Sequence, residues 1–367
     1  MKINLVDYLG VHCGMHYYNE AFEKTLQKIE SIQVKIVSNY GSNRSDNAFF
    51  FNQYKGILPI KILKLCCNLV KLLFYVIFHR KECYVYLTYG NRLDLLFMSI
   101  ITLAPKHIID IHEAVAQCVD DDEKLKQKFK NLYSKRVKSV IYHSDRTLDF
   151  LKEYGYKGET LSVPHFKYCF QKEYDISKVG LDAKDVFSID KINLLFFGNI
   201  NLAKGVDIFI DAVNCLSDEY KSQINVVIAG KNSDDSINIT KPANPELFNL
   251  IVRHIEDDEL VYFYQNCDYV VLPYRKTSQS GILEMAFYFQ KPIIANNVKY
   301  FKQVLDEFST FGVLSTGIDA VQFKDILIQV IDNHKSSQYF DDNQYGKFTN
   351  REEINSFVSE FSEWIYK

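Results

Sequence analysis

The feature that most constrains the fold is the alternation of short apolar runs with helical segments along nearly the whole chain. The runs are rich in Val, Ile, Leu and Phe, which is typical of buried strands. Strands that are apolar on both faces and alternate with helices form parallel sheets covered on both sides, so we expect an α/β fold. The expected strands span 3–6, 34–37, 84–87, 107–111, 139–142, 160–163, 193–197, 225–229, 250–252, 269–272 and 292–295.

Length and the position of one polar stretch predict the domain organisation. A chain of 367 residues is too long for one ordinary core, and the strands fall into two series. The stretch before the second series is polar and has no strong period, as expected of a linker. We therefore predict an N-terminal domain of residues 1–172, a linker of 173–190, a C-terminal domain of 191–347 and a C-terminal helix within 348–367.

Composition and missing motifs exclude several classes of protein. The net charge of −3 argues against a nucleic-acid partner. The 8 cysteines form neither a disulfide pattern nor a zinc pattern, so we expect reduced thiols and no zinc site. The start of the chain has no apolar signal region, which favours a cytoplasmic protein. No GxGxxG, Walker or GxSxG motif occurs, and the acidic run 120–123 is interpreted as the cap of a helix.

The segment Pro273–Glu284 (PYRKTSQSGILE) predicts an anion site. It joins an expected strand to an expected helix through a small polar loop that ends in Ser280 and Gly281. At such a helix start, free N–H groups and the helix dipole point at the same spot. Glu284, one turn into the helix, would repel phosphate but could accept hydrogen bonds from sugar hydroxyls. Phosphate beside sugar hydroxyls indicates a nucleotide-sugar; the alternative for Glu284 is a surface glutamate favoured by the dipole.

The segment Lys55–Lys81 is basic and apolar and contains no acidic residue. Lys61, Lys64 and Lys71 interrupt its apolar run, so we do not expect it to span a membrane. A basic amphipathic helix on an anionic membrane surface fits the pattern. The alternative is a domain helix whose lysines merely face water.

Three segments of the second half stand out by their order and spacing, namely 194–205 (LLFFGNINLAKG), 226–231 (VVIAGK) and 268–295. Together they resemble family-four (group 1) retaining glycosyltransferases of the GT-B fold. A weaker match in the first half is the pair His112-Glu113 after a strand. The resemblance implies two Rossmann-like domains with a cleft between them and a C-terminal helix that returns to the N-terminal domain.

The resemblance implies a donor site for a nucleoside diphosphate sugar in the C-terminal domain. Lys204 would reach the diphosphate, and Glu284 would bind the ribose of the donor; the alternative for Lys204 is a solvent lysine beside a helix start. Catalytic roles fall to His112, Lys204 and Glu284, with His112 near the reacting carbon unless it is an ordinary strand-end histidine. The implied donor residues are Gly198, Asn199, Lys204, Gly230, Arg275, Ser278, Gln279, Ser280, Gly281, Ile282 and Glu284; the acceptor residues are Gly14, His16 and Glu113.

Two positions depart from the family pattern. Asn199 stands where the family usually has an arginine, and Lys276 stands where it often has a first glutamate. Arg275 and Lys276 together add two bases to the donor loop, and these could replace the missing arginine as a phosphate clamp. The departures put the donor identity in doubt and leave two alternatives to a transferase, an epimerase that acts on the nucleotide-sugar alone and a non-catalytic partner subunit of another transferase.

The sequence as a whole predicts a hexosyltransferase-type enzyme. It would transfer a sugar from a nucleoside diphosphate sugar to a saccharide acceptor, with net retention, as the resemblance implies. The resemblance also implies that the reaction needs no metal and no cofactor, because the nucleotide-sugar is itself the substrate. The segment Lys55–Lys81 suggests that the acceptor is lipid-linked and that the protein is peripheral at the inner face of the membrane, as in surface polysaccharide biosynthesis.

Overall fold

The chain divides into two compact units. The computed structural model describes residues 1–40, 50–53, 56–112, 122–143, 145–163, 173–234, 245–277, 280–349 and 352–366. The N-terminal unit contains residues 1–167 together with 351–367, and the C-terminal unit contains residues 168–350. Each unit has its own six-stranded sheet, and within the described residues every pair of neighbouring strands is parallel.

The sheet of the N-terminal unit has the order β2-β1-β3-β4-β5-β6. Its central strands are buried along their whole length, so both faces must be covered by helices. In the register of the sheet, Asp110 lies opposite Leu87 on one side and Ile141 on the other. The strands are β1 (Lys2–Val6), β2 (Gln33–Val37), β3 (Cys83–Thr88), β4 (His107–Ile111), β5 (Ser139–Tyr142) and β6 (Glu159–Ser162).

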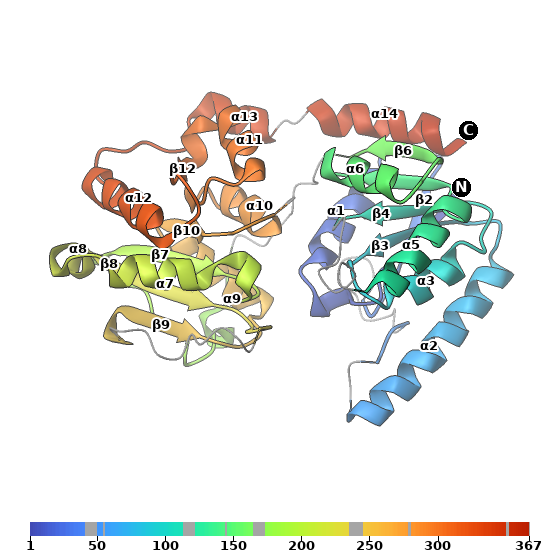
Figure 1. Ribbon diagram of the computed structural model, residues 1–367, viewed down its shortest axis with the longest axis horizontal. Coiled ribbons are helices and arrows are strands. Elements are labelled where there is room, and N and C mark those ends of the chain that lie inside the picture. Colours follow the sequence, from blue (N-terminus) through green and yellow to red (C-terminus); the bar gives the residue numbers. More distant parts are fainter. Residues whose placement is uncertain are drawn as a thin grey trace. The chain divides into compact units, whose positions relative to one another are not determined.

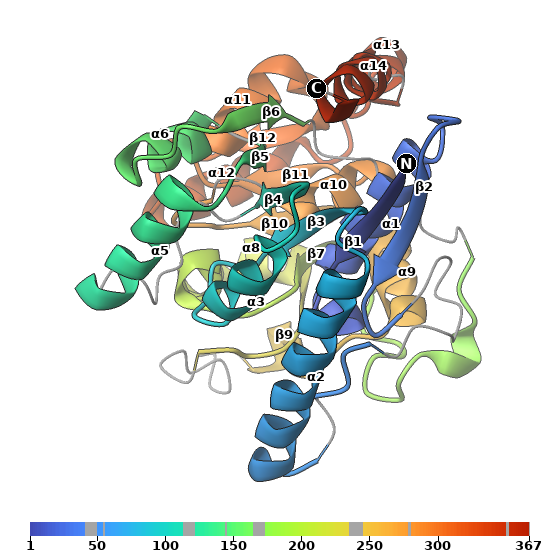
Figure 2. The ribbon, with the colours of Figure 1, turned by 90° about the vertical axis from the view of Figure 1, so that its right-hand side faces the viewer.

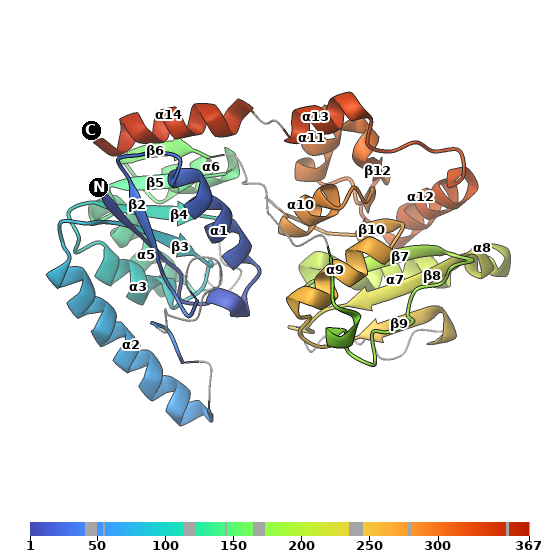
Figure 3. The same cartoon turned by 180° about the vertical axis from the view of Figure 1, so that it is seen from behind.

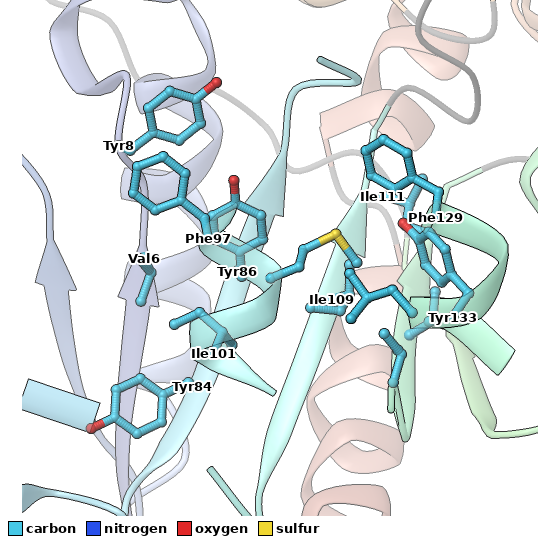
Figure 4. Close-up of a cluster of buried hydrophobic side chains, with 14 of the residues drawn as sticks. Val6, Tyr8, Tyr84, Tyr86, Phe97, Ile101, Ile109, Ile111, Phe129 and Tyr133 are labelled. Carbon is cyan, nitrogen blue, oxygen red and sulfur yellow. The ribbon is translucent and has the colours of Figure 1, made fainter. Parts of the chain in front are cut away.

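The helices of this unit are held by two groups of side-chain contacts, one on the sheet and one between helices. One is the core shown in Figure 4, in which Phe97, Phe129 and Tyr133 lie against strand residues such as Tyr86 and Ile109. The C-terminal helix, α14 (Glu352–Tyr366), packs on α1 (Met15–Leu26), because Phe22 lies 6.0 Å from Phe357 and 6.1 Å from Phe361 between ring centroids. The other helices are α2 (Leu58–Phe78), α3 (Asp94–Ile101), α5 (Glu123–Lys135) and α6 (Asp145–Glu153).

The sheet of the C-terminal unit has the order β12-β11-β10-β7-β8-β9. Counted within the unit this is the strand order of a Rossmann fold, with the direction of winding reversed between β7 and β10. Figures 1 and 3 show α7 and α12 on one face of this sheet and α9 and α10 on the other. The strands are β7 (Ile192–Phe197), β8 (Ile224–Ala229), β9 (Phe248–Ile251), β10 (Tyr269–Leu272), β11 (Ile293–Ala295) and β12 (Gly312–Leu314).

The helices of the C-terminal unit carry apolar residues at helical spacing, and these residues are buried in the core of the unit. Phe209 of α7 and Phe323 of α12 are fully buried and lie 6.1 Å apart between ring centroids. The helices are α7 (Val206–Asn214), α8 (Asp218–Gln223), α9 (Asp257–Asn266), α10 (Gly281–Tyr288), α11 (Lys299–Glu307), α12 (Ala320–Asn333) and α13 (Asp342–Thr349).

The predicted fold class is confirmed: two Rossmann-like sheets of the GT-B type, with a C-terminal helix on the N-terminal unit. The predicted strands all exist, while β12 was not expected. The described residues 173–190, predicted as a linker, belong to the C-terminal unit, where Val179 and Ala183 are buried and the Gly180 N–H donates to Glu259. Asp122 caps α5 by accepting the Leu125 N–H, as the capping interpretation predicted.

Candidate functional site

The predicted donor residues gather at the carboxyl edge of the C-terminal sheet, where β7 and β10 lie side by side. Gly198 follows β7, Gly230 follows β8, and Gly281 begins the helix after β10. The edge between β7 and β10 is the point where the strand order reverses, and open α/β sheets bind ligands there. Topology therefore places these separate sequence segments at one location.

Two glycines make close backbone approach at this edge possible. A Cβ at Gly230 would collide with the carbonyl oxygen of Gly198, so the ends of β8 and β7 can touch only if residue 230 is glycine. Gly205 has φ +65, and a Cβ there would collide with the carbonyl oxygen of Pro273. The turn that precedes α7 is thereby packed directly against the end of β10.

Lys204 ends that turn with its side chain held over an aromatic ring. Its Nζ lies 3.9 Å from the ring centroid of Tyr274, a buried residue just after β10. Asn201 accepts the Lys204 N–H at 3.0 Å and so fixes the turn. A half-buried ammonium on a tyrosine face is more restrained than a lysine in open solvent.

Arg275 links the β10 loop to the turn of Lys204. Its guanidinium donates to both carboxylate oxygens of Asp207, at 2.7 and 2.6 Å, and to the carbonyl oxygen of Leu202 at 2.8 Å. Its own N–H donates to Ala203 at 2.9 Å. Burial alone would raise the pKa of Asp207, but the guanidinium outweighs it and holds that pKa below its usual value. Arg275 thus binds residues on both sides of Lys204, and its guanidinium is engaged by Asp207. This differs from the expected role of Arg275 in a phosphate clamp.

The start of α10 has the geometry expected of an anion site. Ser280 is the N-cap, and its hydroxyl accepts the Leu283 N–H at 3.3 Å. A Cβ at Gly198 would lie 3.0 Å from Cδ1 of Ile282, in the first turn of α10. The start of α10 therefore packs against the end of β7. Glu284 is 4% exposed, so it is not the surface glutamate of the alternative interpretation.

The remaining donor-loop residues have different placements. Asn199 and Lys276, the two departures from the family pattern, are both exposed. Ser278 and Gln279 lie outside the described residues.

In the N-terminal unit, His112 lies at the carboxyl edge of β4 beside three polar side chains that the sequence interpretation missed, Asp110, His143 and Tyr18. His112 Nε2 lies 3.3 Å from Asp110 Oδ1, and His143 Nε2 lies 2.8 Å from the same oxygen. Tyr18 of α1 donates its hydroxyl to Asp110 Oδ2 at 2.9 Å. Burial alone would raise the pKa of Asp110, but the two imidazoles hold it well below its usual range.

The predicted acceptor residues lie near the start of α1, apart from Glu113, which is outside the described residues. Gly14 is the N-cap of α1 and has open space where a Cβ would stand. His16 is buried, with Nδ1 2.7 Å from the Cys13 carbonyl oxygen, and its ring is tilted against that of Tyr17 with 4.0 Å between the centroids.

The part of the chain that contains the predicted donor residues matches a known protein family. Residues 182–347 match the family described as Glycosyl transferases group 1. This part of the chain, just under half of its length, is therefore similar to the group 1 glycosyltransferases. The predicted family resemblance and enzyme class, a glycosyltransferase, are thereby confirmed, and the matched residues include every predicted donor residue. No curated protein matches this chain.

Solved structures with the same fold include three glycosyltransferase-like neighbours. Sucrose-phosphate synthase from Thermosynechococcus elongatus has a TM-score of 0.69 at 14% identity, covering 100% of this chain and 99% of its own. Anabaena HepE, solved in complex with UDP and glucose, has a TM-score of 0.68 at 14% identity, with coverage of 100% and 99%. WaaG, described as a glycosyltransferase involved in lipopolysaccharide biosynthesis, gives 0.59 at 12% identity, with coverage of 97% and 95%. At these identities the likeness establishes the fold alone.

Proposed function

We propose that this glycosyltransferase moves a sugar from a nucleoside diphosphate sugar to a saccharide acceptor, with net retention. The observation that carries the proposal is the meeting of Lys204, Gly198 and the start of α10 at the β7–β10 edge. A fixed cation and a helix N-terminus favour a diphosphate, and a buried carboxylate one turn further along favours hydroxyl groups.

Each donor residue has a role that follows from its position. Lys204 and the N–H groups at Gly281 and Ile282 hold the diphosphate and stabilise the negative charge that grows on it as the glycosidic bond breaks. Glu284 accepts hydrogen bonds from the ribose. The exposed Lys276 is the cation that the β10 loop adds to Lys204, because the guanidinium of Arg275 is engaged by Asp207.

The positive charge at this edge comes from side chains and backbone dipoles, so we propose that turnover needs no metal. Ser278 and Gln279 contribute hydrogen bonds to phosphate oxygens or to the donor sugar. In the N-terminal unit, His112 contacts the donor sugar, and the loop with Gly14 and His16, together with Glu113, binds the acceptor.

The neighbouring structures support a donor and an acceptor class. The complex of HepE contains UDP and glucose, which favours a uridine nucleotide as the first donor to try. WaaG acts in lipopolysaccharide biosynthesis, which favours a lipid-linked acceptor in surface polysaccharide assembly. Both assignments rest on likeness of fold, so the acceptor panel must be broad.

The experiment that tests this function measures release of nucleoside diphosphate from a panel of nucleotide-sugars, with and without saccharide and lipid-linked saccharide acceptors. We expect release that depends on acceptor, is unchanged by EDTA, and gives a product with the anomeric configuration of the donor. Conversion of the donor without acceptor would indicate an epimerase. Binding without release across the panel would indicate a non-catalytic partner subunit.

Helix α2 provides a surface for the lipid side of the reaction. Only Asn68, Leu72 and Val76 of this helix are buried, and its N-terminal turns extend beyond the strands of the unit (Figures 1 and 2). The exposed apolar side chains include a stripe with helical spacing, Leu63, Val70, Phe74, Ile77 and Phe78.

We propose that α2 rests on an anionic membrane surface. Lys61 and Lys71 are exposed, and no acidic residue lies between 55 and 81, so the helix combines apolar contact with positive charge. Each basic residue near such a surface contributes about 1 kcal/mol. Within the described residues every helix is too short or too polar for a membrane span.

Charge reversal on α2 is expected to release the protein from membranes. Replacing Lys61, Lys64 and Lys71 by Glu should weaken binding to phosphatidylserine-containing vesicles at least about a hundredfold, measured by co-sedimentation. The control reverses Lys28, Lys157 and Lys335, which are exposed and lie outside α2, and should lose much less. Equal losses in both triple variants, or no vesicle binding by the unaltered protein, would contradict a docking role for α2.

A further inference from the structure

The side chain of Lys204 is held by an aromatic ring and not by an acid. Its ammonium lies 3.9 Å from the ring centroid of Tyr274, and within the described part of the chain no carboxylate is at salt-bridge distance from it. Arg275 shows the other arrangement, because its guanidinium is engaged by the carboxylate of Asp207. A ring face attracts a cation without neutralising it, so the charge and the N–H groups of Lys204 remain for another partner.

The ring of Tyr274 is itself fixed by packing. Tyr274 is 1% exposed, and its ring centroid lies 5.3 Å from that of Phe301 in α11, which is fully buried. A close-packed interior leaves such a ring little room to move. The Tyr274 hydroxyl is buried and has no hydrogen-bond partner among the described residues. The ring, and not the hydroxyl, is therefore what this side chain offers to Lys204.

A buried amide from another strand holds the backbone of Tyr274. Asn296 follows β11 and is fully buried, and its Nδ2 donates to the carbonyl oxygens of Pro273 at 2.7 Å and Tyr274 at 3.3 Å. Both oxygens can only accept, so the nitrogen of the amide must face them. Separating these groups would leave buried polar atoms unpaired, which costs about 1–3 kcal/mol for each. One side chain thus fixes the two residues that follow β10.

These two residues also contact the turn of Lys204. A Cβ at Gly205 would collide with the Pro273 carbonyl oxygen, which is the oxygen that Asn296 holds. Arg275, next in the chain, donates its N–H to the Ala203 carbonyl oxygen at 2.9 Å. The position of the turn is therefore set by the loop after β10, and Asn296 acts on Lys204 through this loop.

We propose that Tyr274 is a positioning residue whose ring carries the Lys204 ammonium, and that the buried amide of Asn296 is a second positioning residue that keeps this ring in place. The arrangement holds the cation at the β7–β10 edge and leaves its charge for the diphosphate. This last step rests on the proposed function, whereas the place of Lys204 on the ring and the part of Asn296 in it do not.

The first test is an NMR measurement on the protein without any ligand, labelled with ¹³C-lysine. An aromatic ring moves the signals of groups above its face upfield, so we expect the ε-CH₂ signal of Lys204, assigned from Lys204→Arg, upfield of those of solvent lysines. Tyr274→Phe should keep this shift, because the ring face remains. Tyr274→Leu and Asn296→Ala should lose it. This readout needs no donor and no turnover, so it stands even if the proposed function fails.

Two matched variants separate positioning from stability. Tyr269→Leu removes another buried tyrosine, at the opposite end of β10. Asn193→Ala removes another buried amide, which donates to the Ser188 carbonyl oxygen at 2.8 Å near the amino end of β7. Thermal unfolding should show that both controls lose stability, while the Lys204 signal stays where it is in the unaltered protein.

The second test measures turnover. Tyr274→Leu and Asn296→Ala should each lower kcat about 3–30-fold, the loss that one cation–π contact carries, with little change in the KM of the donor. Tyr274→Phe should restore most of kcat. Adding Tyr274→Leu to Lys204→Ala should cost little more than Lys204→Ala alone, because both changes remove the same interaction.

Four results would overturn the proposal. They are a solvent-like Lys204 signal in the unaltered protein, an unmoved Lys204 signal in Asn296→Ala, a Tyr274→Phe enzyme as impaired as Tyr274→Leu, and losses that simply multiply in the double variant. If Tyr274→Leu does not fold, the Lys204 signals of the unaltered protein and of Asn296→Ala decide. If no donor is turned over, the same two signals decide for the position of Lys204.

Discussion

Glu284→Gln is expected to lower kcat/KM by about 10²–10⁴-fold while the protein stays folded. Glu284 is buried in the first turn of α10, next to the proposed diphosphate site. A hydrogen bond to a charged group contributes about 1.5–3 kcal/mol, and a ribose offers two hydroxyls. Glutamine has nearly the same shape but lacks the charge, so it should keep the packing and lose most of the binding energy.

The control for this variant is Glu307→Gln, at the exposed end of α11 in the same unit. It should keep normal turnover. Thermal unfolding of both variants shows whether Glu284 has a structural role instead. Near-normal turnover of Glu284→Gln, or a loss of turnover that only follows a loss of folded protein, would refute its role in the donor site.

Lys204→Ala is expected to lower turnover by about 10²–10³-fold, the loss typical of removing one group that stabilises charge in a transition state. Its ammonium lies over the Tyr274 ring in a turn fixed by Asn201, so we expect it to bind the proposed diphosphate with little further loss of side-chain freedom. The loss should appear mainly in kcat, because negative charge on the diphosphate grows as the sugar leaves.

Lys231→Ala is the matched control, since Lys231 is an exposed lysine after β8 at the same edge of the sheet. It should change turnover little. Arg275→Gln should give an intermediate loss of turnover, because it removes the ion pair with Asp207 that holds the β10 loop against the turn of Lys204. A Lys204→Ala enzyme with near-normal kcat would show that the diphosphate charge is held elsewhere.

The sequence predicted most of the fold because buried parallel strands have a strong signal. Strands such as 84–87 and 269–272 are continuous apolar runs, and they lie within β3 and β10. The strand β12 (Gly312–Leu314) escaped prediction because its only apolar residues are Val313 and Leu314, too few to stand out from a loop. The residues around Val179 have a polar composition, yet they are fixed to the C-terminal unit by a few buried side chains and the Gly180–Glu259 hydrogen bond.

The sequence names candidate site residues where a motif places them, and not where only the fold brings them together. Lys204 and Glu284 follow from their spacing to glycines and strand ends. Tyr274 and Asp207 were missed, because their importance comes from contacts across the β7–β10 edge. His143 was missed for the same reason, although a histidine directly after a buried strand was a usable signal.

The central claim is that the β7–β10 edge of the C-terminal unit binds a nucleoside diphosphate sugar, and ligand-induced stabilisation tests it most directly. Unfolding temperatures should be measured with a panel of nucleotides and nucleotide-sugars. A ligand at 100 times its Kd stabilises the folded protein by about 2.7 kcal/mol, or roughly 5–10 °C for a unit of this size. We predict such a shift with one nucleotide base and its sugar derivatives, reduced in Lys204→Ala and Glu284→Gln. No shift with any member of the panel, or the same shift in both variants as in the unaltered protein, would contradict the claim.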